Sequence, residues 1–210
     1  MHGGVTRQAL GAAGLALACG IAAVAASAVA QEAPVRVRGT IEHVDGQTLT
    51  VKARDGKDVT VKLADNGPVV ATVKAALSDI KPSSFVGVTA LPQTDGSWRA
   101  VEVHIFPEAM RGTGEGDRAW DLQPKSTMTN AAVAEAVKEV DGQTLTLKYK
   151  DGEKKITVPA DAPIVAFEPG DKADLKAGAK IFVPAATRQP DGSLQAARIV
   201  VGKDGLTPPM

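Results

Sequence analysis

Glu102 and His104 come closest, by residue type and spacing, to a chemical site in this sequence. They stand two residues apart in a segment that alternates like a β-strand, so their side chains share one face. A histidine beside a carboxylate can contribute to a metal site, and Glu42 and His43 would add to it if the two strands are neighbours. We therefore consider His43, Glu102 and His104 as metal ligands, against the alternative that they are ordinary polar surface residues.

A second group lies in a glycine-rich segment, residues 108–130. Glycines and arginines suit an anion, but a phosphate loop would continue into a helix with Lys and Ser or Thr, and this segment does not. We expect an ordered loop in which Trp120 packs between domains and an arginine pairs with Glu115, Asp117 or Asp121. The alternative is a partner-binding surface, because tryptophan and arginine are frequent interface anchors. Its residues would be Arg111, Arg118, Trp120 and Asp121.

Catalytic signatures are missing from the sequence. We find no nucleophile elbow, no histidine near a serine or cysteine, and no paired carboxylates in a buried segment. At the predicted turns between strands, six aspartates each precede a glycine, which is typical of a turn in which the carboxylate bonds its own backbone. These are Asp45, Asp55, Asp95, Asp141, Asp151 and Asp191. We therefore expect a protein that is not an enzyme and that needs no cofactor, with a metal as the one possible exception.

The first thirty residues have the pattern of a secretory signal peptide. One basic residue, Arg7, precedes a run of small and apolar residues, and Ala28-Val29-Ala30 forms a small-x-small cleavage site. We expect cleavage after Ala30 and a periplasmic location. A retained membrane anchor and a lipid attached to Cys19 are weaker alternatives, because the run is rich in Ala and Gly and more apolar residues follow the cysteine.

Charge and aromatic content argue against nucleic acid as a partner. The chain has 24 Lys and Arg against 24 Asp and Glu, and only two Trp, one Tyr and four Phe. Single-stranded nucleic acids need a basic groove with stacking aromatic side chains, and neither is indicated here. The chain without its first thirty residues has no cysteine, so no disulfide stabilises it.

An internal repeat organises the rest of the chain. The seven residues Val44 to Thr50 recur without change as Val140 to Thr146, and similarity continues to Asp95-Gly96-Ser97 and Asp191-Gly192-Ser193. We infer that a whole structural unit was duplicated. The second copy has Val200, Arg198, Glu139 and Lys138 in place of His104, Glu102, His43 and Glu42, so it cannot reproduce the metal site.

Alternating hydrophobicity and Asp-Gly turns predict five strands in each copy. The first copy has strands at 35–44, 47–54, 58–63, 84–92 and 97–106, and the second at 132–141, 143–150, 154–159, 179–187 and 193–201. Segments from Thr72 to Lys81 and from Gly170 to Lys176 favour a short helix between the third and fourth strands. We therefore predict an all-β protein with two tandem five-stranded OB-like barrels, with a small open sandwich as the alternative.

The expected domains follow from the repeat. They are a signal peptide at 1–30, one barrel at 31–107, a Gly-rich connector at 108–130, a second barrel at 131–203 and a C-terminal tail at 204–210. The repeat, the Asp-Gly hairpins and the connector from Phe106 to Asp121 resemble the DUF5666 group of exported bacterial β-barrel domains of unknown function. They are also similar to proteobacterial periplasmic proteins sometimes labelled metal transporter components. The resemblance implies a fold but no catalytic residues, and a permease would need several apolar spans.

These observations favour a non-enzymatic binding or assembly module of the cell envelope. Its expected partner is an envelope protein, a glycan or a small ligand, with no nucleic acid and no membrane span after cleavage. Two alternatives stay open, a metal-binding accessory protein and a structural stabiliser without a specific ligand.

Overall fold

The computed structural model describes residues 33–209, and this part of the chain is all-β. The expected signal peptide, its cleavage site and Cys19 lie outside the described residues. The strands of the first copy are β1 (Val35–Asp45), β2 (Thr48–Ala53), β3 (Asp58–Leu63), β4 (Val69–Lys74), β5 (Phe85–Pro92) and β6 (Trp98–Ile105). The connector contributes β7 (Gly116–Ala119). The second copy has β8 (Thr127–Glu139), β9 (Gly142–Tyr149), β10 (Gly152–Pro159), β11 (Ile164–Pro169), β12 (Lys180–Arg188), β13 (Leu194–Ala196) and β14 (Ile199–Gly202).

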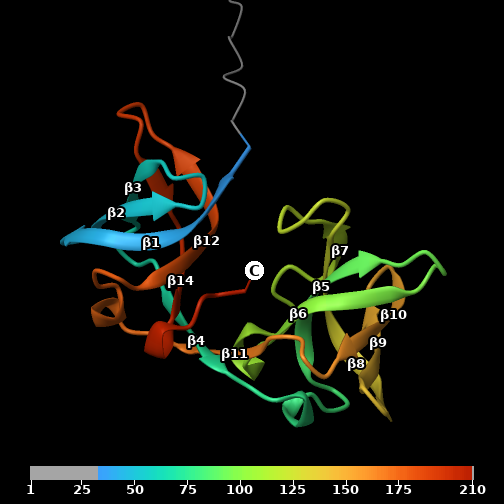
Figure 1. Cartoon of the computed structure of the whole chain (residues 1–210). Coiled ribbons are helices and arrows are strands. Elements are labelled where there is room, and N and C mark those ends of the chain that lie inside the picture. Colours follow the sequence, from blue (N-terminus) through green and yellow to red (C-terminus); the bar gives the residue numbers. More distant parts are fainter. Residues whose placement is uncertain (1–32, 210) are drawn as a thin grey trace, which may run out of the picture. The chain divides into compact units, whose positions relative to one another are not determined.

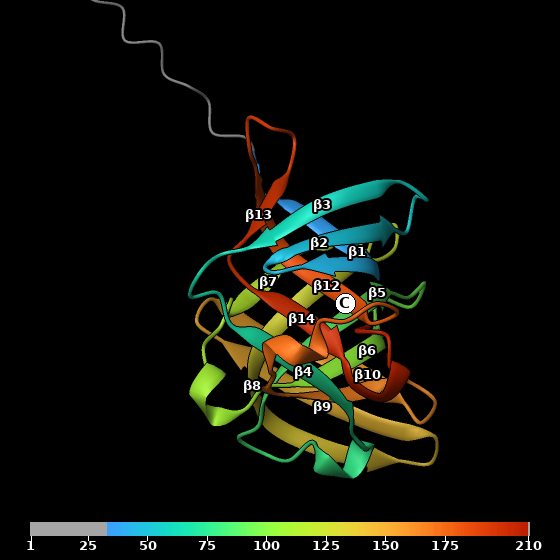
Figure 2. The ribbon, with the colours of Figure 1, turned by 90° about the vertical axis from the view of Figure 1, so that its left-hand side faces the viewer.

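Each of two rings of five strands closes on itself through backbone pairing. The ring called barrel 1 runs β1, β2, β3, β13, β12 and back to β1. The ring called barrel 2 runs β5, β6, β10, β9, β8 and back to β5. A closed five-stranded barrel was expected from the sequence, and it is present. Figure 1 separates the two groups of strands, and Figure 2 shows β1, β2, β3, β12 and β13 together.

The tandem arrangement expected from the sequence is corrected by these pairings. Barrel 1 takes its first three strands from the first copy and its last strands from the second, and barrel 2 is built the opposite way. The copies have exchanged β5 and β6 of the first for β12 and β13 of the second, so neither barrel is a continuous stretch of chain. Strand pairing between distant segments is what local sequence patterns leave undetermined.

The exchange depends on β4 and β11, two strands that the sequence analysis did not predict. They pair antiparallel with each other, and each also pairs in parallel with the last strand of the other copy. Thr72 pairs with Phe167, and these two residues occupy the same place in the two copies. The copies are therefore related by an approximate two-fold axis at this pair, and the extended β4 and β11 carry the chain from one barrel to the other (Figure 1).

The short helices expected in this region are also corrected. Thr72 to Lys74 belong to β4, and only one 3-10 turn, Leu77–Asp79, precedes β5. The second copy has the matching turn at Lys172–Asp174, where the Asp171 carboxylate accepts a hydrogen bond from the backbone of Ala173. An Asp at such a cap favours a turn, but two or three residues are too few for an α-helix to form.

Three apolar cores stabilise the described chain. One fills barrel 1 around Val51 and Val61, and another fills barrel 2 around Leu145 and Ile156. The third lies outside both barrels and contains side chains of both copies, among them Phe85, Phe106, Phe167, Phe182 and Val200. We call this third core, with the connector residues packed on it, the junction. No helix among residues 33–209 has the length and apolar character needed to cross a bilayer.

Candidate functional site

Glu102 and His104 are buried at the junction, on the face of β6 that points away from the core of barrel 2. Val103 between them faces that core. The two polar residues are 1% and 2% exposed, which excludes the alternative of ordinary surface residues. The Thr89 hydroxyl donates a hydrogen bond to Glu102 Oε1, and His104 Nδ1 lies 3.3 Å from Glu102 Oε2. The carboxylate is therefore satisfied within the protein and orients the imidazole.

Space for the imidazole comes from Gly87 on β5. Gly87 pairs with His104 on one side and with Asn130 of β8 on the other. A Cβ atom at this position would lie 1.9 Å from His104 Nε2 and 2.7 Å from Asn130 Oδ1, closer than atoms can approach. The missing side chain therefore lets His104 and Asn130 converge across β5.

Two phenylalanines fix the imidazole from the other sides. The ring centroid of His104 lies 4.9 Å from that of Phe106, in an edge contact, and 5.0 Å from that of Phe167. Phe106 and Phe167 also touch each other at 5.3 Å. Aromatic pairs of this geometry stabilise a fixed arrangement, so the position of His104 is set by packing as well as by Glu102.

His43 does not join this pair. It lies exposed on β1 of barrel 1, while Glu102 and His104 belong to β6 of barrel 2. Within residues 33–209 no three His, Cys, Asp or Glu side chains are arranged to hold a metal ion. The three residues considered together as metal ligands are thus not brought together by the fold.

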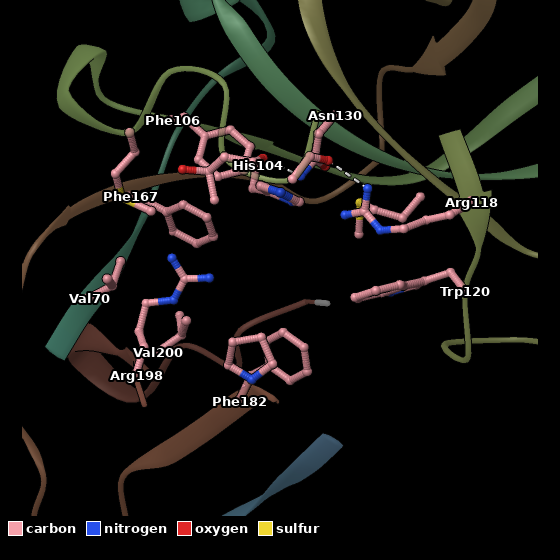
Figure 3. Close-up of a pocket in the computed structure, with 15 residues that line it drawn as sticks. Val70, His104, Phe106, Arg118, Trp120, Asn130, Phe167, Phe182, Arg198 and Val200 are labelled. Carbon is pink, nitrogen blue, oxygen red and sulfur yellow. Dashed lines mark hydrogen bonds between the residues drawn. The ribbon is translucent and has the colours of Figure 1, made fainter. Parts of the chain in front are cut away.

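A cavity of about 110 Å³ opens beside His104 at the junction (Figure 3). Both copies and the connector line it, because the strand exchange places β12, β14, β4, β11 and β6 side by side in this order. Its walls are mainly aromatic and aliphatic, and no Ser, Cys, Asp or Glu is among the described residues that line it. The lining residues are Val70, His104, Phe106, Met110, Thr113, Gly114, Arg118, Trp120, Met128, Asn130, Phe167, Phe182, Pro184, Arg198 and Val200.

Two arginines reach into this cavity from opposite sides, Arg118 of the connector and Arg198 of the second copy (Figure 3). Arg118 Nη1 donates to the carbonyl of Gly114 at 2.6 Å, and its guanidinium lies 5.6 Å from the Trp120 ring centroid. Among residues 33–209, Arg198 has no hydrogen-bonding or ion-pair partner. Burial lowers the pKa of both arginines, and the nearby Arg36 adds to the effect on Arg118. Both cations are thus partly desolvated without a carboxylate in the cavity wall.

Two lining residues also carry polar atoms without a partner. Trp120 Nε1 and Asn130 Oδ1 are buried and make no hydrogen bond within the described structure. The amide nitrogen of Asn130 is satisfied, since it donates to the Thr113 carbonyl at 2.9 Å. Such atoms are rare in folded proteins and each costs about 1–3 kcal/mol, so they favour a further polar group in this region.

The connector is ordered, and Trp120 packs between the two barrels, as expected from the sequence. Strand β7 pairs with β8 of barrel 2, while Trp120 lies 6.3 Å from the Phe182 ring and beneath Arg36 of barrel 1 at 4.2 Å. The expected ion pairs are different, however. Arg111 binds Glu108 through two hydrogen bonds of 2.6 and 2.7 Å, and it is not among the residues that line the cavity.

Asp121 fastens the connector to barrel 1. Its carboxylate accepts hydrogen bonds of 2.8 and 3.2 Å from Arg38, and Arg36 lies 3.7 Å away. The hydrogen bond from Arg38 lowers the pKa of Asp121, and the charges of Arg38 and Arg36 act in the same direction. Of the four residues considered for partner binding, Arg118 and Trp120 line the cavity, while Arg111 and Asp121 stabilise the loop around it.

The lowered pKa of Asp121 predicts an acid-dependent contribution to stability. The stabilisation is fully present above the pKa of the unfolded carboxyl, near ~4, and is lost as the pH falls through the lower folded-state pKa. We expect Asp121→Asn to reduce the free energy of unfolding by about 1 kcal/mol or less at pH 7, since the group is half exposed. Denaturant unfolding of both proteins from pH 7 to pH 2 measures this. A difference that persists unchanged at pH 2 would contradict the assignment.

Sequence reasoning missed Arg198 and the aromatic residues of the second copy. A signal for Arg198 was present, because the repeat aligns it with Glu102. Phe167 and Phe182 carried no such signal, since Phe182 looked like an ordinary strand residue and Phe167 lay between the expected strands. Only the strand exchange brings them to the same cavity.

Comparison with known proteins identifies a family for part of the chain. Residues 38–104 match the model of the family described as Domain of unknown function (DUF5666). Neither the curated proteins nor the solved structures include a match to this chain. The matched segment runs from β1 to β6, so it covers one copy of the repeat rather than one barrel.

Proposed function

Because this chain is a DUF5666-like protein, and the family description gives no activity, we propose from the geometry that it is a non-enzymatic binding module of the cell envelope. Its ligand is a small molecule with one anionic group and an apolar body, held in the junction cavity. The envelope location rests on the signal-peptide pattern of residues 1–30. The single observation that carries the proposal is Arg198, a partly buried cation that faces an apolar cavity without a partner in residues 33–209.

Charge favours an anion over a neutral or cationic ligand. Arg118 and Arg198 enter the cavity from opposite sides, and Glu102 behind His104 is already engaged by Thr89. A buried arginine loses hydration, and a carboxylate that accepts two hydrogen bonds from it offsets this loss. The free Nε1–H of Trp120 would serve as a further donor to the ligand.

Size and wall chemistry restrict the rest of the ligand. A cavity of roughly 150 Å³ lined by apolar side chains holds one benzene molecule in a well-studied case, so about 110 Å³ suits a group of similar size or smaller. Phe106, Phe167 and Phe182 provide flat apolar surfaces for such a group. A whole protein or a glycan chain does not fit this cavity, so of the three expected partner classes a small ligand is favoured.

Benzoate is a suitable probe, because it combines one carboxylate with a ring of this size. We expect the full chain to bind benzoate, and Arg198→Met to weaken the dissociation constant at least about tenfold, or 1.4 kcal/mol. Isothermal titration calorimetry measures both. Arg99→Met is the matched control, since Arg99 is an exposed arginine on β6 away from the cavity, and it should bind benzoate like the original protein.

Benzyl alcohol tests whether charge matters as well as shape. Benzyl alcohol should bind the original protein more weakly than benzoate does. The two ligands should bind Arg198→Met with equal affinity. Equal affinity of benzoate for the original protein and Arg198→Met, or no binding of benzoate at all, would overturn the proposal.

A further inference from the structure

The two barrels differ at one end, and this difference is the basis of a second site. In barrel 2 this end is filled by three large side chains that pack on or beside the core. They are Trp98, Tyr149 and Lys154. Lys154 Nζ lies 3.4 Å from the Trp98 ring centroid and donates to Asp117 at 3.0 Å and to Thr127 at 2.8 Å. The contact of the ammonium with the tryptophan ring and its two hydrogen bonds stabilise these side chains, which close this end of barrel 2.

The register of the strands identifies the corresponding residues of barrel 1. Leu194 begins β13 where Trp98 begins β6, and Ala53 and Tyr149 both end the second strand of their copy. Lys154 pairs with Leu147, whereas Val59 pairs with Val51, the repeat equivalent of Leu147. Barrel 1 therefore has Leu, Ala and Val where barrel 2 has Trp, Tyr and Lys.

These smaller side chains leave the end of barrel 1 open. A cavity of about 360 Å³ lies there, and Ala53, Val59 and Leu194 all line it, together with Val35 and Val37. We call this cavity the barrel 1 mouth. Its floor is apolar, since the five residues just named are Ala, Val and Leu.

The rim of the barrel 1 mouth is basic. It carries Arg36, Arg38, Arg54, Lys57 and Arg188. Two carboxylates lie among these cations, with Asp55 3.3 Å from Lys57 and Asp121 2.8 Å from Arg38. Among the described residues that line the mouth, basic side chains therefore outnumber carboxylates around an apolar opening.

Arg54 is the rim cation whose charge the described residues balance least. Partial burial and the neighbouring Arg38 lower the pKa of Arg54, and Asp121 opposes this only weakly as the last of the three causes. Among residues 33–209 Arg54 has no ion-pair partner. An oxyanion at the rim would relieve the repulsion between these guanidinium groups.

We propose that the barrel 1 mouth is a binding site for an amphiphile with a phosphate head group, whose head binds the arginine rim and whose apolar chain enters between Val37, Val59 and Leu194. A phosphate matches several guanidinium groups at once, because each arginine presents a planar fork of donors. Free inorganic phosphate would leave the apolar floor of the mouth in contact with water. An amphiphile covers the floor with its apolar chain, so the floor favours the amphiphile.

Hexyl phosphate tests this proposal with the full chain, and isothermal titration calorimetry measures its affinity. We expect it to bind at least about tenfold more tightly than inorganic phosphate, and hexanol to bind more weakly than both. Arg54→Gln should weaken hexyl phosphate binding about threefold to tenfold. Lys150→Gln is the matched control, because Lys150 is exposed and follows β9 where Arg54 follows β2.

A plug variant separates shape from charge. Ala53→Tyr introduces the residue that barrel 2 carries at the same place, keeps every cation of the rim, and should abolish the preference for hexyl phosphate over inorganic phosphate. A preference that survives in Ala53→Tyr, or equal binding of the two phosphates to the original protein, would overturn the proposal. Arg198→Met should leave hexyl phosphate binding unchanged, so this site and the junction cavity succeed or fail independently.

Discussion

Cutting the chain in its connector should leave the two halves associated under native conditions. Each barrel contains strands of both copies, so residues on either side of the cut share two cores and many strand pairs. The antiparallel pair β4 and β11 adds a further link between the copies. Two tandem barrels, as expected from the sequence, would instead separate once the connector is cut.

A protease site inserted between Pro124 and Lys125 provides the cut, because both residues are exposed in the turn before β8. Size-exclusion chromatography of the cleaved protein should give one peak at the position of the uncut chain. The halves should separate only in denaturant. Two peaks in native buffer would contradict the strand exchange, and the uncut insertion variant is the control for any effect of the inserted residues.

The sequence predicted the strands well but not their partners. Asp-Gly turns and alternating residues placed β1 to β3, β5 and β6 close to their observed bounds, since these signals are local. Thr72 to Lys81 looked helical from its Ala, Leu and Lys, yet its first residues continue β4. What decides this is the pairing of Thr72 with Phe167, ninety-five positions away in the chain, and no local pattern contains that information.

The repeated heptapeptide shows the same limit within identical residues. In the first copy Gly46 and Gln47 form the turn between β1 and β2, whereas in the second copy Val140 and Asp141 form the turn between β8 and β9. Val44 packs on the core of barrel 1, but Val140 is fully exposed. Seven identical residues thus adopt two registers, so the turn is set by the strands it connects as much as by its own sequence.

The sequence predicted part of the candidate site. Glu102 and His104 share a face, as their spacing indicates, but their burial follows from the connector and from Phe167 of the other copy. Arg198 stands at the position of Glu102 in the repeat, and the two-fold relation brings both positions to the junction. Duplication followed by divergence has therefore placed residues of opposite charge at equivalent positions of the junction, which an exact repeat could not do.

Gly87 is the residue whose substitution should disturb the junction most. We expect Gly87→Ala to lower the free energy of unfolding by about 2–3 kcal/mol, because overpacking in a well-packed core costs about this much. The new Cβ would meet His104 Nε2 at 1.9 Å, and the imidazole cannot turn away without leaving Phe106, Phe167 and Glu102. Denaturant unfolding followed by circular dichroism measures the loss.

A double-mutant cycle with His104→Ala tests whether the imidazole is the cause. In the His104→Ala background the penalty of Gly87→Ala should fall by at least about 1 kcal/mol, since residues in direct contact show coupling of this size. It should not vanish, because Asn130 Oδ1 still lies 2.7 Å from the new atom. An equal penalty in both backgrounds would show that His104 does not lie over Gly87 and would contradict the assignment.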